Sequence, residues 1–417
     1  MSTAQQARRS ALIVGGSLGG LFAANLLHRA GWDVKVFERS ADELAGRGAG
    51  IVTHPELFQA LEQIGILIDE SVGVRVTSRV TLAPDGTVLG RLDMEQVLTA
   101  WGRLYQMLHQ ALPAELYCSG VNVVDVEEQT DGALLKFADG RSEAVDLVVA
   151  ADGIRSTLRQ QLLPAVVPEY AGYIAWRGLV EERDLSTATR DLIFDKFSFC
   201  LPPREQMLGY PVAGPGNTVA AGERRFNFVW YRPAAQDSDL VDLLTDATGK
   251  RFEGGIPPQC IRSDVIRAMR EAAERVLAPQ FAEIIRHTAQ PFFQPIFDLS
   301  SPRLAFGHTA LLGDAAFVAR PHCGMGVTKA AGDAMALVRA LQAHAAVPQA
   351  LQSYAAERGA FGTAVVNHAR HLGAYMQAQI RTAAEREMAE RYRTPEAVMQ
   401  ETASSRAFEL KGVHAPA

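Results

Sequence analysis

Residues 11–20 have the sequence Ala-Leu-Ile-Val-Gly-Gly-Ser-Leu-Gly-Gly, and residues 33–39 have the sequence Asp-Val-Lys-Val-Phe-Glu-Arg. The first stretch begins with four apolar residues, which is typical of a buried strand. Residues 19–30 then carry apolar side chains at helical spacing, and Gly31 is expected to end that helix. The second stretch has the pattern of another strand. This order predicts a βαβ unit, and therefore a parallel sheet in an α/β fold.

The turn between the first strand and the helix is rich in glycine, which is typical of a dinucleotide-binding turn. Small residues there allow the backbone to approach a pyrophosphate, which the helix N-terminus attracts. Gly15 and Gly20 match the G-x-G-x-x-G pattern, whereas Ser17 replaces its second glycine. Glu38 ends the second strand, where a carboxylate can accept both ribose hydroxyls. The predicted nucleotide-binding residues are Gly15, Ser17, Leu18, Gly20, Glu38 and Arg39.

The same turn has a competing interpretation. Gly15 to Gly19 also match G-x-S-x-G, the nucleophile elbow of α/β-hydrolases, in which Ser17 would attack an ester. That elbow usually follows several strands, whereas this one follows the first strand, and no HGGG-type oxyanion segment precedes it. The dinucleotide hypothesis is therefore favoured, with a hydrolase or a purely structural glycine turn as alternatives.

The composition is that of an ordinary globular protein. The 417 residues include 41 Lys and Arg against 47 Asp and Glu, which gives a net charge of −6, and 48% are hydrophobic. This mild acidity gives no reason to expect nucleic acid or an anionic membrane as a partner. The four cysteines form no C-x-x-C pair, no apolar run reaches about 18 residues, and no signal-peptide core is apparent. We therefore expect a cytoplasmic protein without a metal site.

Further along the chain, strand and helix patterns alternate in blocks. Residues 115–151 have the pattern of short strands, with Asp139-Gly140 as a hairpin turn between strands expected at 133–138 and 142–150. Residues 172–232 are the most strand-rich stretch and predict a separate, mostly antiparallel sheet. Within it, the alternation along residues 224–231 predicts a strand with Arg224, Phe226, Phe228 and Trp230 on one face and Arg225, Asn227, Val229 and Tyr231 on the other. The predicted division is 1–165 for the first segment of a nucleotide-binding domain, 166–290 for an inserted sheet domain, 291–345 for the second segment, and 346–417 for C-terminal helices and a loose tail.

Two later segments carry a family resemblance. Residues 146–156 are Asp-Leu-Val-Val-Ala-Ala-Asp-Gly-Ile-Arg-Ser, and residues 312–326 begin with Leu-Gly-Asp-Ala-Ala and end with Arg-Pro-His-Cys-Gly-Met-Gly. With the N-terminal turn they resemble the three fingerprints of class A flavoprotein monooxygenases, the single-component FAD-dependent aromatic hydroxylases. The resemblance implies a Rossmann-like FAD-binding domain with an inserted substrate sheet. It also implies a reaction that consumes NADH or NADPH and O2 and proceeds through a flavin C4a-hydroperoxide.

The resemblance also implies cofactor contacts at the residues that match the family. Asp314 would accept a hydrogen bond from a ribitol hydroxyl, and Asp152 would lie near the pyrophosphate and the path of the nicotinamide. Gly324 and Gly326 would bring backbone N–H groups and a helix N-terminus to the flavin, which carries negative charge when reduced. The further cofactor contacts implied are Gly50, Gly313, Pro321 and Met325.

Three positions depart from the family pattern. Trp101 stands where many relatives have an arginine that touches FAD, and Arg103 is displaced by two residues, so Arg103 is assigned no role. Ala150 replaces the usual glycine before Ala-Asp-Gly, and Phe317 replaces the usual histidine after Gly-Asp-Ala-Ala. We expect none of these changes to remove a group on which the chemistry depends.

Another set of segments is similar to the family members that hydroxylate 2,6-dihydroxypyridines, namely residues 50–57, 170–178 and 320–322. The similarity implies a small, hydroxylated N-heteroaromatic substrate of that type. A urate-like or phenolic substrate is the alternative within the family. A flavoprotein oxidase or reductase without oxygen insertion is the alternative outside it. Family habit and general frequency alone favour a homodimer.

Three side chains are candidates for activating the substrate by holding a ring hydroxyl as its anion. His322 lies between Pro321 and the glycine loop, which would bring it close to the isoalloxazine ring. Tyr210 falls on a central strand of the predicted sheet, which resembles the position of a substrate-binding tyrosine in relatives. His54 follows Gly50 near the predicted pocket. Each of the three also has an ordinary structural interpretation, as a packed side chain or as a hydrogen-bond partner of the backbone.

Overall fold

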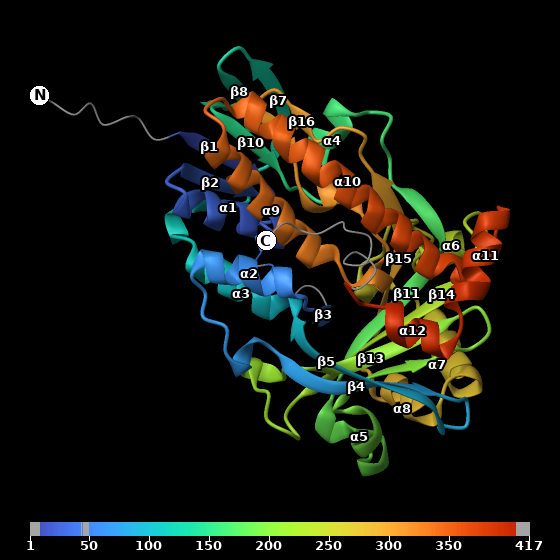
Figure 1. Cartoon of the computed structure of the whole chain (residues 1–417). Helices are drawn as coiled ribbons and strands as arrows, with labels where there is room; N and C mark the ends of the chain where they lie inside the picture. The colour runs from blue at the N-terminus through green and yellow to red at the C-terminus, as the bar shows by residue number, and fades with distance from the viewer. Residues whose placement is uncertain (1–8, 43, 45–49, 406–417) are drawn as a thin grey trace, which may run out of the picture.

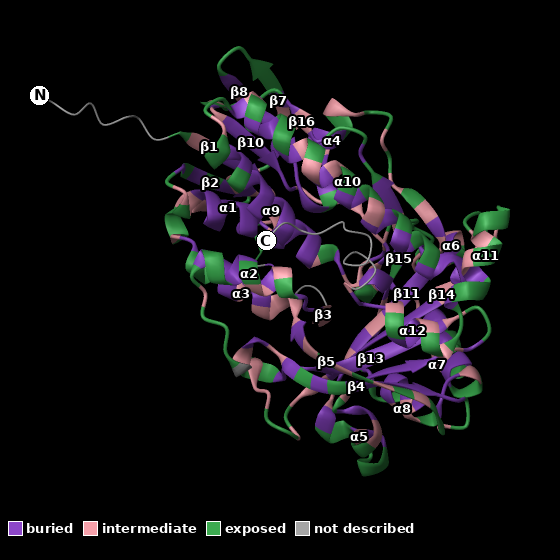
Figure 2. Cartoon of the chain, in the orientation of Figure 1, coloured by how far each residue is buried: buried purple, intermediate pink, exposed green. Residues whose placement is uncertain are grey.

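The computed structural model describes residues 9–42, 44 and 50–405, and it contains two large sheets with helices packed around them (Figure 1). Buried residues run along both sheets and along the helices α1 (Leu18–Arg29) and α9 (Gly326–Ala343), whereas exposed residues lie mainly on the outer surfaces (Figure 2). The predicted Rossmann-like α/β fold with an antiparallel sheet and C-terminal helices is confirmed.

The first large sheet contains the predicted βαβ unit. Its neighbouring strands pair in parallel, except at one edge, where the last pair is antiparallel. The strand order is β16 (Ala305–Phe306), β17 (Thr309–Leu311), β10 (Leu147–Ala150), β1 (Ser10–Val14), β2 (Asp33–Glu38) and β6 (Tyr117–Ser119). The helices of this half are α1, α2 (Pro55–Ile64), α3 (Trp101–Ala111), α4 (Thr157–Leu162), α9 and α10 (Val347–Gly373).

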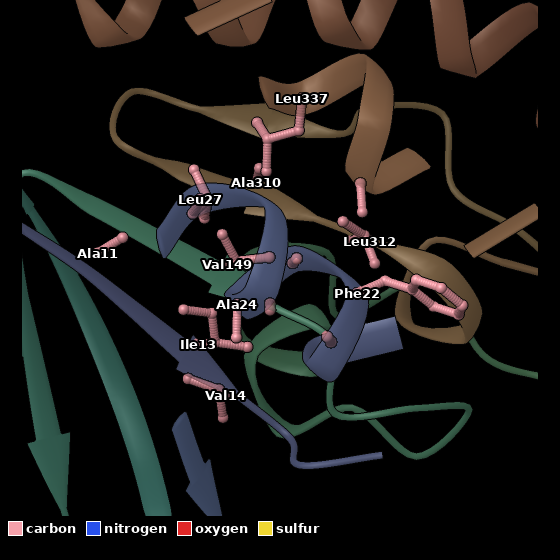
Figure 3. Packing of buried hydrophobic residues seen from close by; sticks show 14 of the residues in the cluster. Ala11, Ile13, Val14, Phe22, Ala24, Leu27, Val149, Ala310, Leu312 and Leu337 are labelled. Carbon is pink, nitrogen blue, oxygen red and sulfur yellow. The ribbon is translucent and has the colours of Figure 1, made fainter. Parts of the chain in front are cut away.

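The core of this half joins segments that are far apart in the sequence. Phe22 and Leu27 of α1 belong to one buried cluster with Ile13 of β1, Val149 of β10 and Leu337 of α9 (Figure 3). All five side chains are fully buried. Burial of each such side chain contributes about 1.5–3 kcal/mol relative to exposure. Apolar packing therefore fixes α9, and with it the glycine loop before α9, against the N-terminal βαβ unit.

The second large sheet is mostly antiparallel, as predicted. Only the pair formed by β12 (Lys196–Cys200) and β4 (Val74–Leu82) is parallel. The strand order is β18 (Phe317–Val318), β15 (Phe292–Ser300), β11 (Glu169–Glu181), β14 (Arg225–Pro233), β13 (Gln206–Val212), β12, β4, β5 (Val88–Ala100) and β3 (Gly50–Val52). The helices α5 (Thr187–Ile193), α6 (Asp239–Leu243), α7 (Ser263–Val276) and α8 (Pro279–His287) belong to this half.

Side chains along β14 (Arg225–Pro233) alternate between an apolar core on one face of the sheet and a cavity on the other. Phe226, Phe228 and Trp230 point to one face and pack in the apolar core that contains residues of α7 and α8. Val229 and Tyr231 point to the opposite face and line a large cavity. One face of the sheet therefore supplies stability, and the other is free to line a binding site.

The structure differs from the sequence-based expectation within residues 142–150, which were expected to form one strand. Asp146 interrupts them, because its carboxylate accepts hydrogen bonds from both the backbone N–H and the hydroxyl of Ser10. The residues before it form β9 (Ser142–Val145), which belongs to a small sheet with β7 (Val123–Gln129) and β8 (Gly132–Phe137). The residues after it form β10 of the first large sheet.

Sheet membership does not follow the predicted segment boundaries everywhere. Strands β3, β4 and β5 lie within predicted segment 1–165, yet they belong to the nine-stranded sheet. Strand β15 lies within predicted segment 291–345 and also joins that sheet. The domain boundaries themselves stay a prediction.

The C-terminal region consists of helices, as expected, but its end is not loose as far as residue 405. After α11 (Ala383–Tyr392) and α12 (Pro395–Glu401), the chain from Thr402 to Ser404 is buried. The backbone N–H of Ala403 donates to the carbonyl oxygen of His322 over 2.7 Å. This segment is therefore part of the tertiary structure.

Candidate active site

A small cavity of about 260 Å³ lies at the ends of β1, β2 and β10. The structure brings five of the predicted nucleotide-binding residues to its wall: Gly15, Ser17, Glu38, Arg39 and Asp152. Leu18 and Gly20 are buried in the first turn of α1 instead and do not line it. Trp101, one of the departures from the family pattern, is also on the wall.

The turn after β1 has room only for glycine at two positions. Gly15 has φ of +105°, and a Cβ atom there would lie 2.4 Å from the carbonyl oxygen of Ala151. A Cβ atom on Gly20 would lie 1.9 Å from the carbonyl oxygen of Gly15. The absence of both side chains lets the turn close tightly at the N-terminus of α1, which is the geometry that a dinucleotide pyrophosphate requires.

The Glu38 carboxylate is held in place by backbone donors. It accepts hydrogen bonds from the N–H of Gly16 over 2.9 Å and from the N–H of Ser40 over 2.8 Å. Each carboxylate oxygen keeps further acceptor capacity for a ribose hydroxyl. Tyr117 was missed from the sequence; its hydroxyl donates to the carbonyl oxygen of Gly16 and fixes the turn from the other side.

The hydrolase alternative gains no support from this geometry. Ser17 begins α1 as its N-cap, and its side chain makes no capping hydrogen bond. Within the part of the chain that the structure describes, no histidine lines the cavity around Ser17. A serine nucleophile needs such a base within hydrogen-bond reach.

Asp152 organises the turn that follows β10. One carboxylate oxygen accepts the N–H groups of Thr157 and Leu158 at the start of α4. The other is buried and has no hydrogen-bond partner among the described residues. Burial raises the pKa of Asp152, because a charged carboxylate loses hydration there. The free oxygen is thus an acceptor that a cofactor hydroxyl can satisfy.

A second cavity of about 1110 Å³ lies between the glycine loop before α9 and the nine-stranded sheet. It collects predicted residues from segments far apart in the sequence. These are Gly50, Tyr210, Asp314, Pro321, His322, Gly324 and Gly326. Gly313 and Met325 are buried just behind this wall and do not line it. His54 is also buried, as the N-cap residue of α2, and does not line it.

Behind Asp314 lies a buried charge network that the sequence analysis missed. The ammonium of Lys329 lies 3.8 Å from Asp314 and 3.9 Å from Asp333, and no hydrogen bond to it is present among the described residues. Asp333 also accepts from Arg358 over 2.7 Å and from the N–H of Gly313 over 3.1 Å. The i, i+4 spacing of Lys329 and Asp333 on the predicted helix was a signal for this pair.

The N-terminus of α9 lies at the cavity, where Gly324, Gly326 and Val327 are part of the wall. Gly324 adopts the left-handed conformation with φ of +66°, and a Cβ atom there would lie 3.0 Å from Ala403. Gly326, the first residue of the helix, has open space where a Cβ would be. A helix N-terminus favours negative charge, so this loop suits an anionic reduced flavin.

The opposite wall of the cavity is aromatic. Phe197, Tyr210 and Tyr231 project from three strands of the nine-stranded sheet, and the rings of Phe197 and Tyr210 lie 4.9 Å apart. A Cβ atom on Gly50 would lie 2.5 Å from the Tyr210 ring. Glycine at residue 50 therefore allows the β3 backbone to lie against Tyr210. Burial raises the pKa of Tyr210, and its hydroxyl stays protonated at neutral pH.

His322 is held on both sides. Its Nδ1 lies 3.2 Å from Oε1 of Gln206, and its Nε2 lies 2.7 Å from the Tyr173 hydroxyl. Because an amide oxygen only accepts, Nδ1 carries the proton and Tyr173 donates to Nε2. Burial lowers the pKa of His322 well below its usual range, and the nearby guanidinium groups of Arg320 and Arg177 lower it further. His322 is therefore neutral. To bind a substrate proton, its ring has to give up its hydrogen bond to Gln206 or to Tyr173.

The lowered pKa predicts how stability depends on pH. Unfolded His322 takes up a proton below about pH 6.5, whereas folded His322 does not. The free energy of unfolding should therefore fall as the pH drops below 6.5, by at most about 1.4 kcal/mol per pH unit from this group. Denaturant titrations at pH 7.5, 6.5 and 5.5 should show a shallower decline for His322→Gln than for the wild type. Equal slopes in the two proteins would contradict a neutral His322.

The C-terminal segment forms part of the cavity, which the sequence did not indicate. Thr402 and Ala403 line it, and the fully buried guanidinium of Arg79 holds them through hydrogen bonds to backbone carbonyl oxygens, including those of Met399 and Ala403. Arg79 lies on β4, more than 300 residues away in the sequence. No local pattern predicts such a contact.

The other departures from the family pattern have structural explanations. Arg103 donates to the hydroxyl of Ser71 over 2.7 Å, away from both cavities. Phe317 is buried against α10, where Gly362 leaves space for its ring. Ala150 is fully buried in β10.

Comparison with known proteins identifies the family. Three family models match the chain: an NAD(P)-binding Rossmann-like domain at residues 13–61, an FAD binding domain-like family at 170–298, and an FAD binding domain at 294–369. The 2,6-dihydroxypyridine 3-monooxygenase of Paenarthrobacter nicotinovorans is 31% identical over 366 residues, which cover 88% of this chain and 91% of that protein. The chain belongs to the FAD-dependent aromatic monooxygenases.

Other similar monooxygenases differ in the substrates that their names state. A 6-hydroxynicotinate 3-monooxygenase of Bordetella bronchiseptica is 28% identical over 371 residues, which cover 83% of this chain and 87% of that protein. An FAD-dependent urate hydroxylase of Klebsiella pneumoniae is 28% identical over 379 residues, covering 84% of this chain and 85% of that protein. Family membership therefore leaves the substrate open.

Solved structures support the same assignment. The 2,6-dihydroxypyridine-3-hydroxylase from Arthrobacter nicotinovorans superimposes with a TM-score of 0.83 at 30% identity, covering 89% of this chain and 93% of that chain. A Klebsiella pneumoniae protein solved with FAD and uric acid shares the fold, with a TM-score of 0.75 at 22% identity, covering 98% and 96% of the two chains.

Residues 9–42, 44 and 50–405 contain neither a membrane-spanning helix nor a cluster of metal ligands. None of the helices there is long and apolar enough to cross a membrane. The same residues contain no group of three or more histidine, cysteine, aspartate or glutamate side chains arranged to hold a metal ion.

Proposed function

We propose that this monooxygenase hydroxylates a hydroxylated pyridine of the 2,6-dihydroxypyridine type, with NADH or NADPH as electron donor and O2 as oxidant. The observation that carries the proposal is the large cavity, in which the glycine loop of α9 faces an aromatic wall of Phe197, Tyr210 and Tyr231. A flat heteroaromatic ring fits between these two surfaces. The similarity to 2,6-dihydroxypyridine 3-monooxygenase supports this substrate class.

The two cavities fit the two ends of an FAD molecule. Gly15, Glu38 and Arg39 would hold the ADP half, and Asp314 would accept a hydroxyl of the ribityl chain. The N–H groups around Gly324 and Gly326 would stabilise negative charge on the flavin ring. When bound, FAD supplies electron transfer from the nicotinamide and oxygen transfer to the substrate.

The protein's own task is to orient the ring and exclude water. The aromatic wall holds the ring plane, and the buried segment from Thr402 to Ser404 closes part of the cavity. His322 is fixed by Gln206 and Tyr173, so its ring edge is a rigid element of the wall. Our candidates for substrate activation remain Tyr210, His322 and His54. Of these three, His54 is buried and does not line the cavity.

Asp314→Ala is expected to weaken FAD retention. Loss of a hydrogen bond between a charged group and the ribityl chain costs about 1.5–3 kcal/mol, which corresponds to about 10-fold to 100-fold in the dissociation constant. The measurement is FAD fluorescence during titration of the apoprotein. Asp191→Ala, at an exposed position of α5, is the control and should bind FAD like the wild type. Unchanged affinity in Asp314→Ala would remove Asp314 from the FAD site.

The reaction is tested by following NADH and NADPH oxidation together with O2 uptake, with and without 2,6-dihydroxypyridine, and by mass spectrometry of the product. We expect 2,6-dihydroxypyridine to speed up the consumption of the nicotinamide and of O2. The product should be one oxygen atom heavier than 2,6-dihydroxypyridine. H2O2 without a heavier product would favour an oxidase or reductase. A response to urate or phenols only would favour the alternative substrates. Homodimer formation stays a prediction.

A further inference from the structure

One positively charged side chain in the large cavity has no partner in the fold. Arg177 lies on β11, paired in register with Val229 of β14 and Phe292 of β15. Its neighbours on the same face of β11, Tyr173 and Ala175, belong to the cluster on the cavity side of the sheet. Arg177 itself lines the cavity. Its side chain therefore comes from the interior of the sheet, on the strand next to β14, which carries Tyr231 of the aromatic wall.

Within the described residues, the Arg177 guanidinium makes no hydrogen bond or ion pair, and its Nε is buried without a partner. Arg177 is half-buried, whereas two buried arginines of this protein have partners for their guanidinium groups. Arg320 makes a bidentate pair with Asp298, and Arg79 donates to three backbone carbonyls. A cation that is partly desolvated and uncompensated costs stability, so a ligand that pairs with it gains that energy on binding.

The side chains nearest to Arg177 in the aromatic wall carry no charge. The guanidinium partly opposes the rise that burial causes in the pKa of Tyr210 and of Tyr231, and it adds to the lowering of the His322 pKa, so its electrostatic field reaches all three side chains. All three are neutral at pH 7, because burial opposes their charged forms. The other charged residues on the cavity wall are Arg155, Glu253 and Asp314. Arg155 and Glu253 are at exposed positions, where Arg155 donates to the carbonyl oxygen of Glu253, and Lys329 is the cation beside Asp314. Arg177 is therefore the positive group available to a ligand at the aromatic wall.

We propose that Arg177 binds an anionic oxygen of the aromatic substrate, and that through this residue the cavity prefers an anionic ring to a neutral ring of the same shape. This inference rests on the proposed function and deepens it. A planar guanidinium can donate two parallel hydrogen bonds to an oxyanion or carboxylate on the ring. The negative charge raises electron density at the ring carbons and so favours attack on an electrophilic oxygen. Arg177 is then a binding and specificity residue.

The test compares ligands that differ in charge and little in shape. FAD-loaded wild type, Arg177→Gln and Arg177→Lys are titrated calorimetrically at pH 8 with 2,6-dihydroxypyridine, with 6-hydroxynicotinate and with its neutral amide. Arg225→Gln is the matched control, because Arg225 lies on β14 of the same sheet but donates to the carbonyl oxygen of Ala213. Flavin content of each variant shows that the fold is kept.

We expect Arg177→Gln to weaken binding of the two anionic ligands by about 10-fold to 100-fold and to leave the neutral amide within about twofold. Arg177→Lys should recover part of the loss, since the charge is kept. Arg225→Gln should bind all three ligands like the wild type. If Arg177→Gln does not retain flavin, the Arg177→Lys variant tests the inference. That variant must then bind the two anionic ligands more weakly than the wild type and bind the neutral amide like the wild type.

Two results would overturn the inference: equal loss for the anionic and neutral ligands, or no loss for either. Failure of the proposed substrate is a separate result. If the wild type ignores 2,6-dihydroxypyridine but binds 6-hydroxynicotinate more tightly than its amide, and only with Arg177 present, the proposed substrate is wrong and the anion site stands. If the wild type does not prefer the carboxylate to the amide, the anion site is wrong, whatever product 2,6-dihydroxypyridine gives.

Discussion

Asp333→Ala is expected to lower the free energy of unfolding by about 3–5 kcal/mol, because it leaves the buried Arg358 without a counter-ion and leaves the buried Lys329 with Asp314 alone. Asp333 lies between Lys329 and Arg358, and the side chains of all three are at most 3% exposed. The substitution also removes the acceptor for the N–H of Gly313, the residue before Asp314. We therefore expect weaker FAD binding as well. Urea denaturation and FAD titration measure the two effects.

The chain offers a matched control between the same two helices. Arg339 of α9 and Glu357 of α10 form an ion pair at the surface, where the side chains are 43% and 33% exposed. Glu357→Ala should cost at most about 1 kcal/mol, because water solvates both charges after the change. A cost for Asp333→Ala no larger than that for Glu357→Ala would show that the network behind Asp314 does not support the fold.

Gly20→Ala is expected to abolish tight FAD binding and to lower stability by about 1–3 kcal/mol or more, as overpacking does. The new methyl group would lie 1.9 Å from the carbonyl oxygen of Gly15. Because both atoms belong to the turn between β1 and α1, the turn has to open. The opening moves the N–H groups that would bind the pyrophosphate. Flavin content after purification and denaturant titration are the measurements.

The neighbouring glycine gives the opposite expectation. A Cβ atom on Gly19 would lie 3.4 Å from Leu312 and 3.6 Å from Ala330, which are ordinary van der Waals distances. Gly19→Ala should therefore leave FAD binding intact and stabilise α1 by about 0.5–1 kcal/mol. If Gly19→Ala and Gly20→Ala had the same flavin content, the tight turn would not be the feature that cofactor binding needs.

Local patterns in the sequence determined much of the fold. The apolar run before Gly15 and the helical spacing after it predicted β1, α1 and β2 to within one residue at each end. The alternation along residues 224–231 predicted a strand with two different faces, and both faces are used. These features depend on residues close together in the chain, where the period of the side chains and the turn residues decide the structure.

The family motifs also carried part of the candidate site. Gly15, Glu38 and Asp152 meet in one cavity, and Asp314 and Gly324 meet in the other. Their roles toward FAD remain proposals. The sequence could not predict that Asp146 divides one expected strand between two sheets, since that depends on its hydrogen bonds to Ser10.

What the sequence by itself determined is the βαβ unit, the family and the segments that approach the cofactor. The tertiary structure alone decided which charges are paired. Lys329 has Asp314 and Asp333 beside it, Arg79 has the C-terminal backbone, and Arg177 has no partner in the described chain. The physical reason is that pairing depends on distances between side chains brought together by packing. Residue type fixes a charge, but only the fold decides whether a counter-charge is within reach.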